Sequence, residues 1–433
     1  MSPAKVFPRF QISPGSSGVT AFGGLPLIAH LAESLGVIAA IDRQLGGLKR
    51  RRRGYAVWQP LLSLVLLLVA GGNRLDDIEL LRSDRNLRRL LGQARLPAAT
   101  TLGGFLRRFN RRSLAALSQV SASLVTRVLL KRHITAVTLD FDATLIESHK
   151  QDARMTYKGF RGYDPLLCFV AETGQVLRGI FRPGNASPSG NALSFLRGTL
   201  KLLPPWLSRI SIRSDSAWYN HELLDYCHAR RIRFAITAVI TDPLVETLKA
   251  IPEAEWRPLD RDKQKKIASE VAVTYYVVGN GARAYRLVAV RRPARQSDVF
   301  RGAYDYYAVI TNIEDTRPAA LIRWHRKRAN AENMIKELKL GLGLDNLPCG
   351  ELLANAAYFE ANILAYNLVQ TLKQIVLPAG WRQYAMKTLR VRLFTMGATV
   401  VRHARQLLLR ISAEHPYWQI LLAAYQRAPA LGG

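Results

Sequence analysis

Apolar residues recur every three or four positions through most of the first 130 residues, the spacing of helices that bury one face. The stretches with this pattern are 25–45, 58–72, 74–92 and 96–130. Within them, Leu61–Ala70 is strongly apolar but too short to cross a bilayer, so it is expected to be a buried helix. Residues 1–20 hold Pro, Gly and Ser without periodicity and are expected to form an extended arm. We therefore expect a helical region over residues 1–130.

From His133 onward, apolar and polar residues alternate, which is typical of half-buried strands. Strand patterns occupy 134–146, 165–171, 176–183, 209–215 and 231–240, and helical patterns lie at 189–203 and 219–230. The turn residues Glu172-Thr173-Gly174 separate the second strand from the third. This mixed order is that of an RNase H-like domain. It predicts an α/β catalytic core with a mixed five-stranded sheet and helices, whose first part spans residues 131–240.

Residues 241–315 carry strand signals of their own. VAVTYYVVG and AYRLVAVRR alternate around Asn280-Gly281, a strong hairpin dipeptide, and YDYYAVIT resembles a further strand. We predict a β-rich insertion there, after which residues 316–345 supply the final helix of the core. Residues 346–433 return to helical spacing, including the stretch 381–411, and are predicted to form a C-terminal helical region packed on the core.

Candidate chemistry first appears in the stretch 324–339, WHRKRANAENMIKELK. As a helix, it places four polar residues within a sector of roughly 60°, beside an apolar stripe that can pack on a sheet. These four residues are His325, Arg328, Glu332 and Lys339. One carboxylate among cations suits a metal-dependent phosphodiester site, since the acid can hold a divalent cation while the bases hold phosphate oxygens. Alternatively, this is an ordinary solvated helix face. Glu337 points elsewhere on the helix and is the weaker candidate.

Partners for Glu332 exist upstream at the ends of predicted strands. The first strand carries Asp140 and Asp142 on one face, and the fourth strand stops at Asp215. In the RNase H-like plan, carboxylates of the first strand, the fourth strand and the last helix converge. Asp142, Asp215 and Glu332 are therefore the candidate catalytic and metal-binding residues. Asp140 has two interpretations, a metal ligand or a supporting carboxylate behind the ligands.

The net charge of the chain indicates the kind of molecule that it binds. Lys and Arg number 62 against 32 Asp and Glu, a net charge of +30 in a chain that is 48% hydrophobic. Such an excess, spread along a folded chain, is typical of a protein that binds nucleic acid; an acidic membrane surface is the rival partner, but no long basic amphipathic helix dominates. Candidate DNA contacts outside the 324–339 helix are Arg107 and Arg108 in the helical region, Lys158 and Arg161 in a Gly-rich loop, Arg182 after the third strand, and Trp256 in the insertion. For the loop residues a mobile basic loop is the alternative, and for Trp256 it is sheet core.

Several other classes of protein are disfavoured. Cys168, Cys227 and Cys349 are far apart with no CxxC pair, which argues against zinc ribbons and disulfide frameworks and favours a reducing cytoplasm. The first residues lack a signal-peptide hydrophobic region. No HExxH or P-loop GKS/T motif occurs, so a zinc hydrolase and an ATP-driven mechanism are not expected.

Together these motifs resemble bacterial insertion-sequence transposases of the DDE type, in the superfamily whose third motif reads Tyr-x2-Arg-x3-Glu-x6-Lys. Arg328, Glu332 and Lys339 match that spacing, with His325 where the family usually has Tyr. LDFDATL resembles the first motif and points to Asp142, and IRSDSAWY resembles the second and points to Asp215. The resemblance covers most of the chain from about residue 25 onward.

The resemblance implies metal-dependent cleavage and joining of DNA. Two Mg2+ (or Mn2+) ions per active site would be held by carboxylate oxygens, with Asp142 bridging both and Asp215 and Glu332 binding one each. The expected function is a transposase that binds terminal inverted repeats and moves its element by cut and paste, as a homodimer on DNA in the bacterial cytoplasm. A metal-dependent nuclease without joining activity and a catalytically inactive DNA-binding protein are the alternatives.

Overall fold

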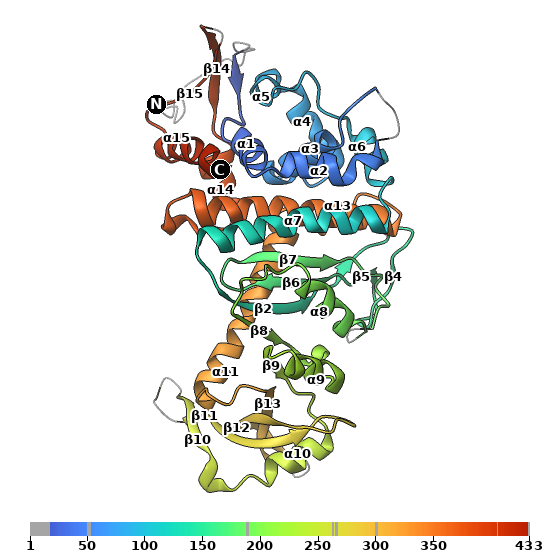
Figure 1. The fold of residues 1–433 in the computed structure, drawn as a ribbon, viewed down its shortest axis with the longest axis vertical. Coiled ribbons are helices and arrows are strands. Elements are labelled where there is room, and N and C mark those ends of the chain that lie inside the picture. The colour runs from blue at the N-terminus through green and yellow to red at the C-terminus, as the bar shows by residue number, and fades with distance from the viewer. Residues whose placement is uncertain are drawn as a thin grey trace, which may run out of the picture.

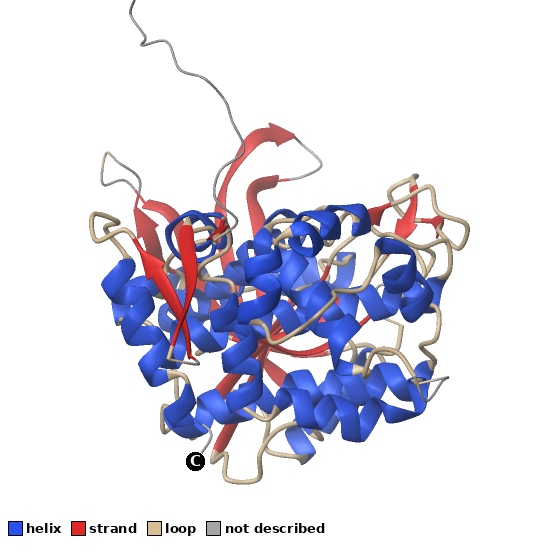
Figure 2. Cartoon of the chain, turned by 90° about the horizontal axis from the view of Figure 1, so that it is seen from above, coloured by secondary structure: helices blue, strands red, loops and turns tan. Residues whose placement is uncertain are grey.

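The computed structural model describes residues 18–49, 53–187, 190–261, 264, 267–298, 302–404 and 406–431. The expected N-terminal arm, apart from residues 18–20, lies outside this description. Both ends of the described chain meet in a helical layer, a pair of long helices follows, and a large sheet lies beyond them (Figure 1). Viewed from above, helices surround much of this sheet (Figure 2). The mixed α/β class expected from sequence is confirmed.

The helical pattern of the first 130 residues is confirmed. The helices are α1 (Pro26–Ser34), α2 (Val37–Leu45), α3 (Trp58–Ala70), α4 (Ile78–Ser83), α5 (Arg85–Leu90), α6 (Ala99–Leu106) and α7 (Arg111–Lys131). The α3 helix is apolar all round and almost wholly buried, as its composition requires. The α7 helix is long and apolar enough to cross a membrane, but it lies along α13 (Leu352–Thr371), and Ser121 accepts a hydrogen bond from Asn367 at 3.0 Å. Its composition is therefore explained by core packing.

One nine-stranded sheet forms the centre of the fold, in the order β10-β11-β12-β13-β9-β8-β2-β6-β7. The five strands expected for the core are β2 (Ala136–Ala143), β6 (Leu166–Val170), β7 (Gln175–Ile180), β8 (Arg209–Ser214) and β9 (Arg233–Thr237). β2, β6 and β7 pair antiparallel, whereas β2, β8 and β9 pair parallel. The turn between β6 and β7 contains Gly174 at φ +67°, a conformation that glycine adopts without strain.

Helices cover both faces of the sheet. α8 (Ala192–Leu200), α9 (His221–Ala229) and α10 (Asp242–Lys249) share one buried apolar cluster with one face. α11 (Pro318–Arg326) and α13 pack on the opposite face. Gly179 of β7 permits the close approach of α13, because a Cβ there would lie 2.6 Å from Phe359 and Ile363 atoms. The even-numbered residues of β2, including Asp142, therefore face the side of the sheet that α11 covers.

The predicted β-rich insertion is not a separate sheet. Its strands are β10 (Arg257–Arg261), β11 (Ile267–Val277), β12 (Ala284–Asp298) and β13 (Gly302–Thr311). β13 pairs antiparallel with β9, so these strands extend the core sheet. The described sheet therefore holds nine strands rather than the five expected, and the predicted β-rich segment contributes four of them. Pairing with β13 satisfies the backbone groups that β9 would otherwise expose at an edge.

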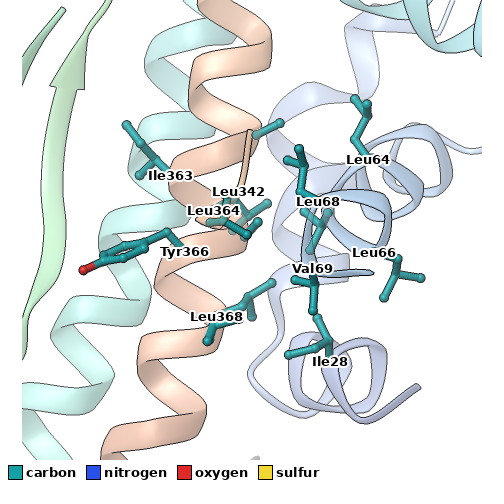
Figure 3. Packing of buried hydrophobic residues seen from close by; sticks show 14 of the residues in the cluster. Ile28, Leu64, Leu66, Leu68, Val69, Leu342, Ile363, Leu364, Tyr366 and Leu368 are labelled. Atoms are coloured by element: carbon teal, nitrogen blue, oxygen red, sulfur yellow. The ribbon is translucent and has the colours of Figure 1, made fainter. Parts of the chain in front are cut away.

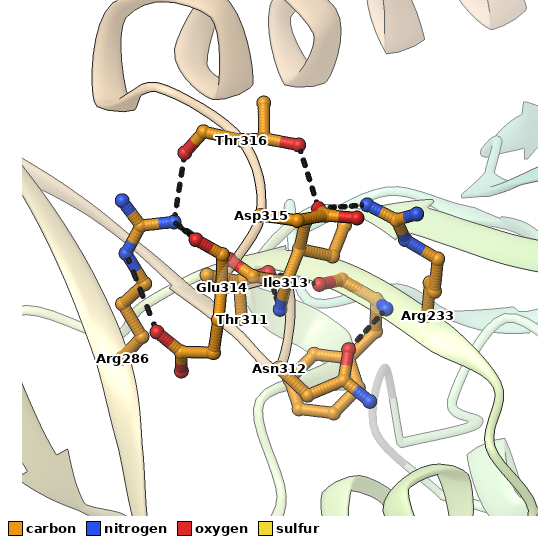
Figure 4. Close-up of polar contacts among 9 residues, drawn as sticks. Arg233, Arg286, Thr311, Asn312, Ile313, Glu314, Asp315 and Thr316 are labelled. Carbon is orange, nitrogen blue, oxygen red and sulfur yellow. Dashed lines mark hydrogen bonds and ion pairs between the residues drawn. The ribbon is translucent and has the colours of Figure 1, made fainter.

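The chain returns from β13 to α11 through a turn that the sheet holds in place (Figure 4). Arg286 of β12 donates to the Thr316 carbonyl at 2.9 Å, and Arg233 of β9 pairs with Asp315 at 2.6 Å. Asn312 accepts a hydrogen bond from the backbone of β9 at 2.9 Å. The start of α11 is therefore tied to β12 and β9, the two strands that flank β13.

The C-terminal region is only partly helical. α13 and α15 (Trp418–Arg427) agree with the prediction, but β14 (Ala398–His403) and β15 (Gln406–Ile411) form a hairpin within the stretch expected to be helical. β1 (Val19–Thr20) pairs with the base of β14. The β-branched Thr399, Val400 and Val401 favour a strand, and β15 pairs with β14 along its whole length while β1 adds two residue pairs.

The α13 helix is central to the largest buried cluster. Its Leu364 and Leu368 face Leu68 and Val69 of α3, with Leu342 between the two helices (Figure 3). Helices from both halves of the chain thus share one core, so the N-terminal and C-terminal regions pack as one unit.

We expect Leu364→Ala to lower the free energy of unfolding by about 2–5 kcal/mol, because Leu364 is 1% exposed and its loss leaves a cavity. Urea unfolding followed by circular dichroism measures this change. Leu422→Ala on α15 is the matched control, since Leu422 is 48% exposed. Equal losses in the two variants would contradict the central place of α13 in the core.

Candidate active site

Asp142 and Asp215 stand near the ends of neighbouring parallel strands. In the β2–β8 register Asp140 lies opposite Arg213, so Asp142 and Asp215 each follow two residues farther along. Residues two apart in an extended strand share a face, which directs both carboxylates to the side covered by α11. Asp215 also accepts a hydrogen bond from the Ala217 amide at 3.1 Å, which caps the short helical turn that ends the strand.

Glu332 comes from the helical segment that follows α11. This segment continues through a 3-10 turn, η5 (Lys327–Ala329), into α12 (Asn330–Lys336) and then a π-helical turn, η6 (Glu337–Gly341). Ala331, Ile335 and Leu338 are buried, as the apolar stripe predicted, while Glu332 is exposed. Glu337 instead accepts a hydrogen bond from the Met386 amide, a structural role consistent with its lower ranking.

The three candidate carboxylates line one pocket of about 560 Å³. Its other polar lining residues are Thr144, Arg328, Lys336, Lys339 and Asp345. Asp142, Asp215 and Glu332, which are far apart along the chain, thus meet at one place, on the elements expected from sequence. The pocket combines acids at its centre with bases on the helix beside it.

Repulsion among the acids shows in the electrostatics of Asp142. Burial raises the pKa of Asp142 to about 6, and the negative charges of Asp215 and Glu332 add to this rise. Arg328 and the Ala143 amide, which donates to Asp142 at 2.9 Å, oppose it. The carboxylates are therefore close enough to repel one another, and a bound cation would relieve that repulsion.

The donor set fits a hard divalent cation, because carboxylate oxygens are the ligands that Mg2+ and Mn2+ prefer. Within the described part of the chain, no three His, Cys, Asp or Glu side chains are already arranged to hold a metal ion. The acids line the pocket without closing on one point. Glu332 lines the pocket from an exposed position on α12.

Lys339, expected to bind phosphate, is partly engaged by the protein. Its Nζ donates to the Leu145 carbonyl at 2.9 Å and pairs with Asp345 at 3.2 Å. Sequence reasoning missed Asp345 and Lys336 as pocket residues. Lys336 could have been found from its position four residues after Glu332, one helical turn along. Asp345 lies beyond the helix, and only the turn after η6 brings it to the pocket.

Asp140 is not available as a metal ligand. It is 1% exposed, and its two carboxylate oxygens accept hydrogen bonds from Arg213, both at 2.7 Å. The interpretation of Asp140 as a supporting carboxylate agrees with this geometry. Its partner Arg213 is a further residue that sequence reasoning missed. The repeated spacing was a usable signal, because Asp140 precedes Asp142 by two residues and Arg213 precedes Asp215 by two.

His325 is buried rather than directed at phosphate. Its Nδ1 accepts from the Tyr307 hydroxyl at 2.8 Å, and its Nε2 donates to the Ser214 carbonyl at 3.1 Å. Burial, assisted by the charges of nearby arginines, lowers the pKa of His325 to about 4. The ring is therefore neutral and fully engaged, so the expected phosphate contact is corrected. The helix turns this side chain toward the sheet, beside the strand end that carries Asp215.

Two further expected DNA contacts also lie in the interior. Arg182 is 7% exposed and pairs with Asp164 at 2.7 Å. Trp256 is 5% exposed and its ring lies against the guanidinium of Arg291, 4.4 Å from the ring centre. Both predicted DNA contacts are corrected to structural roles, because each side chain is buried against a partner inside the fold. The sheet-core alternative for Trp256 was the right one.

The remaining candidate DNA contacts are accessible. Lys158 and Arg161 are exposed in and beside the loop after β4 (Arg154–Met155), and Arg161 donates to the Ala153 carbonyl at 3.2 Å. Arg107 is exposed and pairs with Glu351 at 2.8 Å. Arg108 and Arg328 are partly buried. Contact of these residues with DNA stays a prediction.

Comparison with known proteins identifies the family of the chain. The family described as Transposase DDE domain group 1 matches residues 9–432. No curated protein sequence matches the chain significantly. Among solved structures, the chain is similar to a piggyBac transposase, described as a synaptic complex with hairpin DNA, at a TM-score of 0.46 and 12% identity over 87% of this chain and 81% of that one. With the family match spanning nearly all of its length, the chain belongs to the group 1 family of DDE-domain transposases.

Proposed function

We propose that this transposase binds the terminal inverted repeats of an insertion sequence, cleaves the DNA at its ends and joins them to target DNA by a cut-and-paste route. The single observation that carries this proposal is the pocket in which Asp142, Asp215 and Glu332 meet beside a row of cations. The strand order β7-β6-β2-β8-β9 supports an RNase H-like core at its centre.

Each pocket residue has a part in this proposal. Asp142 would contact both of two Mg2+ or Mn2+ ions, while Asp215 and Glu332 would each hold one. When bound, such ions activate the attacking oxygen and stabilise the leaving one. Arg328 and Lys336 lie on the same helical segment and would hold the phosphate oxygens of the cleaved strand. The positive charge they bring also offsets the repulsion between an anionic backbone and three carboxylates.

The proposal also covers the oligomeric state and the cellular location of the protein. Joining requires two ends at once, so we propose that the chain acts as a homodimer on DNA. A bacterial cytoplasmic site at the nucleoid suits the basic chain and its three cysteines, each of which is free and buried. A nuclease without joining activity is the second candidate, because the same acids would serve hydrolysis alone.

A second pocket indicates where the DNA would continue. This pocket, of about 480 Å³, lies between the helical layer and the loop that follows η6. Its basic residues are Arg74, Arg107 and Lys150, and it shares that loop with the acidic pocket, since Asn346 lines one and Asp345 the other. We propose that the phosphate backbone of the DNA duplex runs from the pocket carboxylates across the side chains of Arg74, Arg107 and Lys150.

Arg74→Gln and Lys150→Gln are each expected to weaken binding of an end-bearing duplex. Each change removes one phosphate contact, so the slope of log affinity against log salt should fall by about 1. Fluorescence anisotropy over a range of salt concentrations measures this slope. Lys249→Gln, on α10 and already paired with Glu246, is the control and should keep the slope of the unaltered protein. Unchanged slopes for both pocket variants would remove this DNA path.

The function itself is tested with a labelled duplex that carries a terminal repeat taken from beside the coding region. With Mg2+, joined products would support a transposase, and cleavage alone would support the nuclease. A mobility shift without cleavage would contradict both.

A further inference from the structure

One buried guanidinium joins the strands that carry Asp142 and Asp215 to α11, the helix that precedes the Glu332 segment. Arg213 of β8 is 3% exposed. Its Nε and Nη2 donate to the two oxygens of Asp140 on β2, and its Nη1 donates to the Trp324 carbonyl on α11, each at 2.7 Å. The guanidinium carbon also lies 5.1 Å from the centre of the Trp324 ring. The planar fork of Arg213 thus bonds to a second strand and to the helix at once.

The Arg213–Asp140 pair occupies the register position that precedes the pocket acids. Asp140 and Arg213 are opposite one another in the parallel β2–β8 ladder. A slip of β8 by one residue would turn Arg213 to the other face of the sheet and leave it and Asp140 as two buried charges without partners. The ion pair therefore favours the one register in which Asp142 and Asp215 lie side by side.

A second hydrogen bond connects α11 to β8, at the residue that follows Arg213. The imidazole of His325 donates to the carbonyl of Ser214, the residue that immediately precedes Asp215. The Tyr307 hydroxyl, by donating to Nδ1, leaves the proton on the nitrogen that makes this bond. This hydrogen bond holds the end of α11 against the end of β8. His325, which donates it, lies seven residues before Glu332.

We propose that Arg213 and Asp140 are positioning residues that align Asp142, Asp215 and Glu332 for divalent cations before DNA binds. Neither residue touches the cations or the substrate. Their effect passes through the strand register and through α11 to the three acids. This inference rests on the proposed cation-dependent function of the pocket.

The test compares Arg213→Lys with Arg291→Lys. Lysine keeps the charge but cannot bond to both oxygens of Asp140 and to the Trp324 carbonyl. Arg291 is a matched control, because it is also buried, pairs with Glu270 at 2.8 Å and lies against a Trp ring, yet belongs to β12. For each DNA-free variant, calorimetry measures the Mn2+ dissociation constant, thermal unfolding measures stability, and amide hydrogen exchange of residues 324–332 is followed without metal.

Arg213→Lys is expected to raise the Mn2+ dissociation constant about 10- to 100-fold and to speed exchange in residues 324–332. Arg291→Lys should lower the unfolding temperature but leave both quantities unchanged. If Arg213→Lys does not fold, Asp140→Asn keeps the volume and one acceptor, and it should change both quantities in the same direction. Mn2+ affinity and exchange equal to those of the control would overturn the inference while leaving the proposed function intact. A wild-type protein that binds no Mn2+ would remove both together.

Discussion

Asp142→Asn is expected to slow single-turnover cleavage of an end-bearing duplex by at least about a thousandfold. Cation-assisted stabilisation of charge at the transition state is worth several kcal/mol, and each 1.4 kcal/mol is about tenfold in rate. Affinity for the duplex should change little, because Arg328 and Lys336 remain in the pocket. Gel-based kinetics and anisotropy on the same preparation separate the two effects. Asp215→Asn and Glu332→Gln should behave alike.

Glu222→Gln is the control for these variants, since Glu222 is exposed on α9, on the opposite face of the sheet. It should retain full cleavage. Full activity in Asp142→Asn would exclude the proposed site.

The same substitution should make the metal-free protein more stable. The pKa of Asp142 is about 6 in the folded protein against 3.8 ordinarily, so its contribution to stability is complete below pH 3.8 and is lost as the pH rises through 6. Asn stays uncharged as the pH rises, so the variant does not lose this stability. Because the side chain is only partly buried, the gain above pH 6 is discounted to about 1 kcal/mol. Greater stability together with lost activity would distinguish a functional acid from a structural one.

Glu360→Gln is expected to stabilise the protein at alkaline pH by a few kcal/mol. Glu360 lies on α13 at 5% exposure, and its Oε2 has no hydrogen-bond partner. Burial raises the pKa of Glu360 to about 8, opposed by the charge of Arg178. Each unit of this rise corresponds to about 1.4 kcal/mol between the two protonation states.

The direction of the pKa shift of Glu360 determines the pH range in which the variant is more stable than the wild type. The folded pKa is raised above the ordinary 4.5, so the stability that Glu360 contributes is complete below pH 4.5 and is lost as the pH passes 8. The variant should therefore match the wild type at pH 4 and exceed it at pH 9. Urea midpoints at both pH values measure this difference, with Glu222→Gln as the surface control. A variant less stable than the wild type at pH 9 would contradict the assigned burial cost.

Most of the elements were predictable because their patterns are local. The alternation of β2 and the turn at Gly174 identify the antiparallel strands, and the apolar stripe of the 324–339 segment predicts a helix. The stretch at β14 and β15 was misassigned although the two strands form a local hairpin. Its consecutive apolar residues, Val400-Val401 and Leu407-Leu408-Leu409, do not alternate as in a half-buried strand, so their spacing does not separate strand from helix.

The candidate acids were predictable, but the roles of their neighbours were not. Side-chain chemistry and spacing single out Asp142, Asp215 and Glu332 from the sequence, because strand ends and helix faces are encoded locally. Whether a nearby polar residue faces solvent or a buried partner depends on elements far away in the chain. The sequence predicts DNA contacts at His325, Arg182 and Trp256, yet each finds its partner inside the fold.

The order of residues thus determined most of the element types, the basic character and the candidate acids Asp142, Asp215 and Glu332. Tertiary structure alone decided that the strands of residues 257–311 extend the core sheet, that Asp140 belongs to Arg213, and that Asp345 reaches the pocket. The reason is physical. Burial and ion pairing are properties of a place in the folded molecule, and that place is set by contacts between residues that are remote in sequence.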